Sequence, residues 1–188
     1  ERTVKTITRA AARHILVVPT SGRIISVMPE TVMSLPAVQF AITSNGALAY
    51  RLKDNKVIYS NYIPPENAAA VFRTIPKTMW AELWANGKIY MERDKFLHRS
   101  DYPLNPFHAE VIQKIGMEIG SLTSAEALPG LIEKINLPCI LPTLKQKLWA
   151  EFSSWGSFSL IDTPNGFEIM NRGTSKAVGL SGLCRRLY

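Results

Sequence analysis

The sequence predicts an α/β protein in which a parallel sheet is interrupted by an α+β region. Residues 15–18 and 38–43 are short β-branched apolar runs, each followed by a polar loop with glycine. Such runs are typical of buried parallel strands. After residue 62 the pattern changes, because hairpin turns begin to mix with helices. A chain of 188 residues with 46% hydrophobic side chains is long enough to bury a core for this fold.

The first 62 residues predict alternating helices and strands. Residues 3–14 carry apolar side chains at helical spacing, so a helix is expected before the first strand. A second, short helix is expected at residues 30–35, where the next residue is proline. Residues 47–51 and 56–61 flank an Asp-Asn pair, which predicts a hairpin after the second strand.

The middle of the chain predicts hairpins and helices in turn. Residues 65–74 begin with proline and continue into an alanine-rich stretch, which favours a helix. Asn86-Gly87 predicts a hairpin between strands at residues 78–85 and 88–92, and Thr-Pro-Asn predicts another between residues 158–162 and 166–170. The other expected elements are helices at residues 107–117 and 128–135, a strand at 139–141, a helix or strand at 144–152, and a final helix at 175–187.

The positive charge of the chain lies in its two flanks. The net charge is +7; residues 1–62 contribute +5 and residues 173–188 contribute +3, whereas residues 63–172 contribute −1. These basic residues are scattered and have few aromatic neighbours, unlike a surface that binds nucleic acid. We therefore expect no nucleic-acid partner, although the charge leaves such a function as a third alternative. We interpret the same charge as a basic half-site whose acidic half is absent from this chain.

Cysteine and histidine usage narrows the class of protein further. Cys139 and Cys184 are the two cysteines and lack the spacing of a disulfide framework or a zinc site, which favours a cytoplasmic setting. No apolar run approaches the roughly 18 residues of a membrane span, so no membrane association is expected. The histidines His14, His98 and His108 are scattered, so surface or capping roles are expected and no metal site is predicted among them.

Three polar loops hold residue types that bind anions. Residues 20–23 and 44–46 each follow an expected strand, and open α/β sheets bind ligands at the carboxyl ends of their strands. Lys176 begins the last expected helix, where exposed N–H groups and the helix dipole attract phosphate. Taken singly, each loop is also a common turn and the lysine a common surface residue. The candidate residues are Ser21, Gly22, Arg23, Ser44, Asn45, Gly46 and Lys176.

The aromatic residues of the middle region give a weaker signal. Trp80 and Trp84 could line a ligand pocket, but burial in a core is the more common role of tryptophan.

Together, three segments resemble the haloacid dehalogenase (HAD)-like phosphatases of the Cof-type subfamily. Leu-Val-Val-Pro-Thr-Ser-Gly-Arg at residues 16–23 is similar to the second motif of that family, a hydrophobic strand followed by Thr/Ser-Gly-Arg. Ala-Ile-Thr-Ser-Asn-Gly-Ala at residues 41–47 is similar to its Ile-x-Ser-Asn-Gly-Ala signature. The sequence at residues 167–177, which ends in Gly-Thr-Ser-Lys-Ala, resembles the segment that carries the third motif.

The resemblance implies a domain organisation and a set of site residues. Residues 1–62 and 173–188 would form an incomplete Rossmann-like HAD core, and residues 63–172 would form an inserted α+β cap domain. Ser21 and Lys176 would be catalytic: Ser21 would hydrogen-bond the phosphoryl oxygens, and Lys176 would neutralise the phosphate. The residues that would contact the substrate phosphate are Gly22, Arg23, Ser44, Asn45 and Gly46.

The resemblance also implies residues that this chain does not contain. The nucleophilic aspartate of the family lies in an Asp-x-Asp-Gly-Thr loop, and its metal-binding motif is Gly-Asp-x-x-Asn-Asp; neither motif occurs here. We therefore expect a fragment of a Mg²⁺-dependent phosphatase of small phosphorylated metabolites, inactive by itself, whose Mg²⁺ ligands lie on absent segments. The alternative is a non-catalytic phosphate-binding or ligand-binding α/β module, or an inert fragment. The sequence predicts no oligomeric state.

Overall fold

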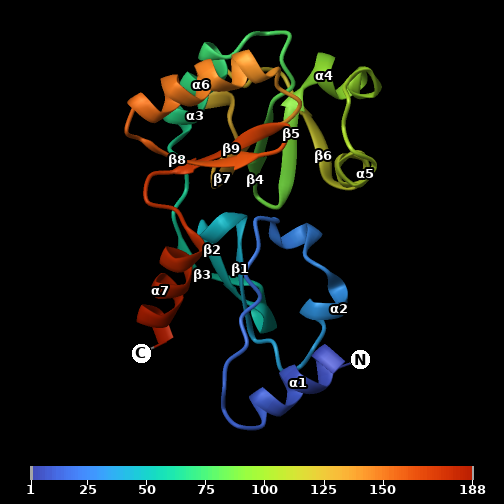
Figure 1. The fold of residues 1–188 in the computed structure, drawn as a ribbon, viewed down its shortest axis with the longest axis vertical. Helices are drawn as coiled ribbons and strands as arrows, with labels where there is room; N and C mark the ends of the chain where they lie inside the picture. The colour runs from blue at the N-terminus through green and yellow to red at the C-terminus, as the bar shows by residue number, and fades with distance from the viewer. Residues whose placement is uncertain (1, 188) are drawn as a thin grey trace. The chain divides into compact units, whose positions relative to one another are not determined.

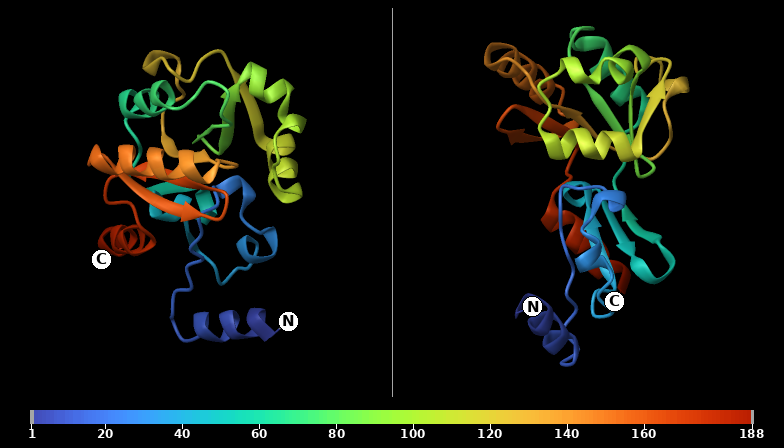
Figure 2. Two further views of the ribbon diagram at one scale, coloured as in Figure 1. Left: turned by 45° about the horizontal axis from the view of Figure 1, so that its top comes forward. Right: turned by 90° about the vertical axis from the view of Figure 1, so that its right-hand side faces the viewer.

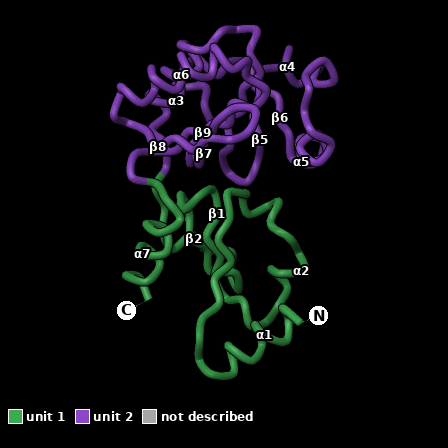
Figure 3. The backbone as a smooth tube through the Cα atoms, viewed as in Figure 1, with its two compact units in different colours: residues 1–61, 174–188 green, residues 62–173 purple. Residues whose placement is uncertain are grey.

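The computed structural model describes residues 2–187 and divides the chain into two compact units (Figure 1 and Figure 3). Unit 1 consists of Glu1–Asn61 and Thr174–Tyr188, and unit 2 consists of Tyr62–Gly173. Unit 2 is therefore inserted into unit 1 along the chain. That unit 1 is a catalytic core and unit 2 a cap stays a prediction.

Unit 1 contains a three-stranded sheet with the order β1-β2-β3. Both ladders of this sheet are antiparallel, with Ile42 opposite Ala49 in the first of them. Helix α7 packs on the sheet, and its Leu183 joins Phe40 and Ile42 in a small buried cluster. The elements of unit 1 are α1 (Arg2–Ala11), η1 (Ile25–Val27), α2 (Glu30–Met33), β1 (Phe40–Thr43), η2 (Ser44–Gly46), β2 (Leu48–Arg51), η3 (Leu52–Asp54), β3 (Lys56–Ser60) and α7 (Lys176–Leu187).

Most expected elements of unit 1 are confirmed, but the strand expected at residues 15–18 is wrong. Ile15 and Leu16 are 56% and 43% exposed, and the parallel pairing starts later, as a single bridge between Thr20 and Ile42. The Pro19 carbonyl accepts from the Ile42 amide at 2.8 Å, and the Ser21 amide donates to the Ile42 carbonyl at 2.9 Å. Val18 packs against the small cluster of Phe40 and Ile42, whereas Ile15 and Leu16 lie before this contact and stay exposed.

Helix α1 forms as expected, but its apolar side chains are not buried. None of the described residues of α1 is buried, and Val4 is 41% exposed. Helical spacing therefore predicted the local structure of this segment and not its packing.

Unit 2 is built on a six-stranded sheet with the order β6-β5-β4-β7-β9-β8. Strands β5 and β6 pair in parallel, and the other ladders are antiparallel. Helices α4 and α5 connect the parallel pair and lie at that edge of the sheet (Figure 1 and Figure 2). The elements are α3 (Pro65–Thr74), β4 (Glu82–Ala85), β5 (Lys88–Glu92), α4 (Arg93–Leu97), η4 (Arg99–Asp101), α5 (Pro106–Ile115), β6 (Gly116–Ile119), η5 (Ala125–Ala127), β7 (Ile132–Leu137), α6 (Pro142–Ser154), β8 (Phe158–Thr163) and β9 (Gly166–Asn171).

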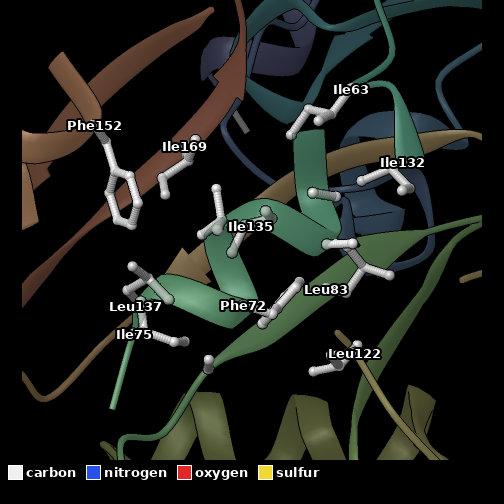
Figure 4. Packing of buried hydrophobic residues seen from close by; sticks show 14 of the residues in the cluster. Ile63, Phe72, Ile75, Leu83, Leu122, Ile132, Ile135, Leu137, Phe152 and Ile169 are labelled. Atoms are coloured by element: carbon white, nitrogen blue, oxygen red, sulfur yellow. The ribbon is translucent and has the colours of Figure 1, made fainter. Parts of the chain in front are cut away.

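The main core of unit 2 lies between the sheet and helices α3 and α6. Phe72 of α3 and Phe152 of α6 pack against the strand residues Leu83, Ile135 and Ile169, all of them buried (Figure 4). The mixed α/β architecture expected from the sequence is confirmed, since both units combine sheets with helices and the parallel pairing occurs within them.

Two expectations for unit 2 are wrong. Residues 128–135 do not form a helix, because β7 begins at Ile132 and lies between β4 and β9, where burial outweighs local helix propensity. Residues 139–141 do not form a strand, and Cys139 has a left-handed φ of 59°. The open choice at residues 144–152 is settled as helix α6. Helix α3 and the two hairpins are confirmed.

Within residues 2–187, every helix is too short or too polar to cross a membrane.

Candidate functional site

The first two candidate loops of unit 1 are joined by backbone hydrogen bonds. The Asn45 amide donates to the Ser21 carbonyl at 3.0 Å, and the Ser44 amide donates to the Arg23 carbonyl at 2.9 Å. These bonds continue the bridge between Thr20 and Ile42 beyond the end of β1. The loop at residues 20–23 and the turn η2 therefore lie side by side, as their positions after two parallel segments predicted.

Glycine at position 22 allows the Asn45 side chain to approach the first loop. A Cβ atom at Gly22 would lie 2.6 Å from Asn45 Oδ1, which is closer than side chains tolerate. Asn45 is 5% exposed and has a left-handed φ of 58°, a conformation that asparagine adopts more readily than most residues. The Ser-Asn-Gly sequence thus holds a buried amide against the Ser21–Gly22 backbone.

The third candidate segment, the start of α7, packs directly against Gly46. A Cβ atom at Gly46 would lie 2.0 Å from the Ser175 carbonyl oxygen and 2.9 Å from the Lys176 amide nitrogen. Gly179, one turn further along α7, also lies close, since a Cβ there would lie 2.8 Å from Gly46 Cα. Two glycines therefore let the loop and the helix touch through their backbones. The structure brings Lys176 to the same place as the first two loops.

Side chains of unit 1 cap and anchor the start of α7. The Val178 amide donates to Ser175 Oγ at 3.2 Å, which is the N-cap arrangement preferred by serine. Asn61 Nδ2 donates to Thr174 Oγ1 at 2.9 Å, and Thr174 is buried. The end of the helix that carries Lys176 is therefore fixed in position, while the Lys176 side chain itself is exposed.

The candidate residues differ in their exposure. Ser21 is half-buried, and its Oγ accepts from the Arg23 amide at 3.1 Å. Ser44 and Gly46 are buried within η2, whereas the Arg23 side chain is exposed. The structure thus gathers the backbones of all three segments. The Ser21 side chain is half-buried, the Asn45 side chain is buried, and the Lys176 side chain is exposed.

Thr43, the residue before η2, is a further polar residue of the site that was not predicted from the sequence. Among the described residues, Thr43 Oγ1 is a buried side-chain oxygen without a hydrogen-bond partner, and Thr43 is 0% exposed. Leaving such a group unpaired costs about 1–3 kcal/mol. The hydroxyl of Thr43 is therefore a further donor next to the candidate loops. Its place at the end of a buried strand, before Ser-Asn-Gly, is the signal that could have identified it.

The donors at this place suit an anion and do not suit a magnesium ion. Magnesium prefers oxygen ligands, mostly carboxylates and water. The described carboxylates of unit 1 are those of Glu30 and Asp54, and Asp54 forms an ion pair with Arg51 at 2.7 Å on the far end of β2. The hydrogen bond from Arg51 holds the pKa of Asp54 below its usual value. No cluster of three metal-binding side chains occurs among residues 2–187.

A second polar cluster lies inside unit 2, around the buried carboxylate of Glu82. Glu82 is 0% exposed, and its oxygens accept four hydrogen bonds. The donors are Trp80 Nε1 at 2.6 Å, Trp84 Nε1 at 2.9 Å, His108 Nε2 at 2.6 Å and Asn136 Nδ2 at 2.9 Å. Trp80 and Trp84 are core residues, the more common of the two roles considered for them. The surface or capping role expected for His108 is wrong, because its ring pairs with a buried carboxylate.

The charges of this cluster compensate one another. Burial raises the pKa of Glu82, but the hydrogen bonds from His108, Trp80 and Asn136 outweigh this effect, so its pKa lies below the usual value. Burial lowers the pKa of His108, but the Glu82 carboxylate outweighs this effect and raises it. Because the four donors saturate the Glu82 carboxylate, this cluster is suited to holding strands β4 and β7 together.

Comparison with known proteins identifies the family. The family model of the haloacid dehalogenase-like hydrolases matches residues 1–188. The chain therefore belongs to the haloacid dehalogenase-like hydrolases, and the resemblance seen in the sequence is confirmed. A search of curated proteins found no match.

Solved structures of this family share the fold of the chain. The HAD subclass IIB sugar phosphatase BT4131 is 15% identical with a TM-score of 0.69, and the match covers 100% of this chain and 68% of that chain. A haloacid dehalogenase-like hydrolase from Bacteroides thetaiotaomicron is 18% identical with a TM-score of 0.73, covering 99% and 69%. One from B. subtilis is 18% identical with a TM-score of 0.71, covering 97% and 71%. At these identities the likeness concerns the fold.

Proposed function

We propose that this chain carries the phosphate-binding loops of a phosphomonoester hydrolase that acts on small phosphorylated metabolites. The observation that carries the proposal is the meeting of three segments, residues 20–23, 44–46 and 174–176, which are far apart in sequence. The family supports a hydrolase, and the sugar phosphatase BT4131 has the same fold. A cytoplasmic setting stays a prediction.

Each candidate residue has a role that follows from its chemistry. The Ser21 hydroxyl donates to a phosphoryl oxygen, and Gly22 leaves room for the Asn45 side chain beside the phosphate. The side-chain amide of Asn45 and the backbone beside Gly46 contact the substrate phosphate. Ser44 supports the turn. The Lys176 ammonium neutralises charge on the phosphate. Fixed donors and cations of this kind stabilise the spread negative charge of phosphoryl transfer. Arg23, which is exposed, contributes a further positive charge.

The proposal assigns the attacking carboxylate to a part of the protein outside residues 1–188. An aspartyl-phosphate intermediate requires a carboxylate nucleophile. The described carboxylates of unit 1 are Glu30 and Asp54, and Asp54 is paired with Arg51. The Mg²⁺ on which relatives of this kind depend would likewise take its ligands from elsewhere, because the three loops do not fit a magnesium site. The longer relatives, of which this chain spans about two thirds, leave room for such segments.

Unit 2 would act as the cap of this hydrolase. Its insertion between Asn61 and Thr174 supports this role, because α7 carries Lys176 directly after the chain returns from unit 2. A cap of this kind would exclude water and select the organic part of the substrate.

Binding of inorganic phosphate tests the proposed loops. We expect saturable binding to the chain by isothermal titration calorimetry, weakened at least tenfold in Ser21→Ala and in Lys176→Met, because each loses a group that faces the anion. Lys53→Met is the matched control, since Lys53 is exposed in the same unit on the other end of β2. Equal affinities for the Lys176 and Lys53 variants would contradict the proposal.

Turnover separates the hydrolase from a non-catalytic binding module. With an aryl phosphate and Mg²⁺, residues 1–188 are expected to show no turnover. A longer chain that includes an Asp-x-Asp-Gly-Thr segment is expected to be active. Phosphate binding without turnover in that longer chain would favour the binding module. Clear turnover by residues 1–188 would overturn the assignment of the nucleophile to another segment.

A further inference from the structure

A cavity of about 250 Å³ lies wholly within unit 2, away from the proposed phosphate loops along the chain. It lies at the carboxyl ends of the parallel strands β5 and β6, since its wall includes Glu92, the last residue of β5, and residues 121–123, which follow β6. In open parallel sheets ligands bind at the carboxyl ends of the strands, and β5 and β6 are the parallel pair of this sheet. The placement of the cavity alone therefore makes it a candidate site.

One side of the cavity is apolar. Phe72 and Ile75 at the end of α3, Met79 before β4, and Leu122 form this wall. Phe72, Ile75 and Leu122 are labelled in Figure 4 at the border of the main core of unit 2. An apolar wall of a cavity favours a ligand with an apolar part.

The wall of the cavity also includes Lys95, whose side chain is largely buried. Lys95 is 8% exposed, and its Nζ donates to the Tyr102 hydroxyl at 2.8 Å. Its ion pair with Asp94 is long, at 3.9 Å, and the Asp94 carboxylate is largely exposed. A buried charge normally has close partners of opposite charge. A phenol and a distant carboxylate leave Lys95 able to accept an anionic partner from the cavity.

A carboxylate and two hydroxyl groups line the same cavity. Glu92 is half-buried; its Oε1 accepts from the Leu122 amide at 3.2 Å, and the described ion pairs do not join it to Lys95. The hydroxyls of Ser121 and Thr123 lie 2.9 Å apart. Arg73 fixes this loop by donating to the Thr123 carbonyl at 2.7 Å. Opposite charges thus face one cavity without neutralising each other.

We propose that this cavity binds an α-amino acid with an apolar side chain. The amino-acid carboxylate pairs with Lys95, its ammonium group pairs with Glu92, and its side chain packs against Phe72, Ile75 and Leu122. Lys77 also lines the cavity and is exposed. Two lysines and one glutamate therefore line the cavity, so the carboxylate of the amino acid contributes more to its affinity than the ammonium group does. A volume of about 250 Å³ equals roughly eight water molecules of about 30 Å³ each, which suits one small metabolite.

Calorimetry with L-leucine and two of its analogues tests this site. In the unmodified chain we expect saturable binding of L-leucine. Both 4-methylpentanoate, which lacks the ammonium group, and 3-methylbutylamine, which lacks the carboxylate, are expected to bind at least tenfold more weakly, with the amine the weaker of the two. Failure of L-leucine to bind at millimolar concentration, or equal binding of all three compounds, would overturn the proposal.

Substitutions of Lys95 and Glu92 test which residue binds each charged group of the amino acid. Lys95→Met is expected to weaken leucine binding at least tenfold, whereas Lys114→Met, which removes an exposed lysine of α5, leaves it unchanged. Glu92→Gln keeps an acceptor for the Leu122 amide. It is expected to weaken the binding of L-leucine but not the binding of 4-methylpentanoate. Glu110→Gln is its exposed control. If Lys95→Met does not fold, the Glu92 variant and the two analogues still test the proposed binding of the amino acid. Since all these residues lie in unit 2, phosphate binding by unit 1 is measured independently.

Discussion

The two units treat their polar groups in opposite ways. In unit 2 the Glu82 carboxylate is saturated by four donors, one of them the paired histidine His108. In unit 1 the hydroxyl of Thr43 is buried without a described partner. The Lys176 side chain is exposed, at the start of the helix that packs against the loop at residues 44–46. The Glu82 cluster of unit 2 therefore stabilises the fold, whereas we propose that the donors of unit 1 bind an anion that the chain does not provide.

Removing the buried carboxylate of unit 2 is expected to have the largest effect on stability. Glu82→Ala leaves four donors, among them His108, without their acceptor, and breaking a buried pair of this kind costs about 3–5 kcal/mol. Urea unfolding followed by tryptophan fluorescence reports the change, because Trp80 and Trp84 donate to this carboxylate. Glu110→Ala, in which an exposed carboxylate is lost, is the control. Similar unfolding midpoints for the two variants would show that the cluster does not stabilise unit 2.

Separating the loops of unit 1 is expected to have the next largest effect. Gly46→Ala places a Cβ 2.0 Å from the Ser175 carbonyl oxygen and requires alanine to adopt a φ of +101°. We expect a loss of about 2–3 kcal/mol of stability together with the loss of phosphate binding. Gly156→Ala is the matched control, since Gly156 has a φ of +65° and no atom near its Cβ position. If Gly46→Ala binds phosphate as the Gly156 variant does, contact between η2 and α7 is not needed for the site.

The pairing of Glu82 with His108 predicts how stability depends on pH. The folded-state pKa of His108 is raised, so its contribution is present below its unfolded pKa and is lost as the pH rises through the folded pKa. The pKa of Glu82 is lowered, so its contribution is lost only as the pH falls through that lower pKa. The stability difference between the unmodified chain and His108→Gln should therefore shrink between pH 6 and pH 9, roughly the range around the ordinary histidine pKa.

Urea midpoints measured across this range test the pH dependence. His98→Gln is the control, because His98 pairs with the exposed Asp94. A stability difference for His108→Gln that is the same at both ends of the range would show that the Glu82–His108 pair does not titrate as described.

The parts of the fold that local chemistry determines were predictable from the sequence. Asn86-Gly87 and the proline at the start of α3 predicted a hairpin and a helix that the structure contains. Strand β7 was not predictable in this way, because its neighbours β4 and β9 are distant in sequence and burial between them decides its structure. The apolar run at residues 15–18 likewise predicted a buried strand, but Ile15 is exposed, because burial depends on neighbours that the local pattern does not describe.

The candidate site was predictable in its residues and not in its contacts. Ser-Gly-Arg, Ser-Asn-Gly and Ser-Lys are local signals, and the residues that they contain meet in unit 1. The close approach of Gly46 to Ser175 depends on the packing of α7, which no local pattern describes. The Glu82–His108 pair and the cavity beside Lys95 arise from pairings across 26 residues and between several elements, so the sequence analysis overlooked both.

Mapping backbone amides during a phosphate titration shows whether the three loops bind one anion together. If the three loops form one anion site, the amides of residues 21–23, 44–46 and 175–178 shift together in NMR spectra and fit a single dissociation constant. Amides of unit 2 that are buried around Glu82 stay unchanged. Shifts confined to one loop, or a different dissociation constant for each loop, would contradict a common site.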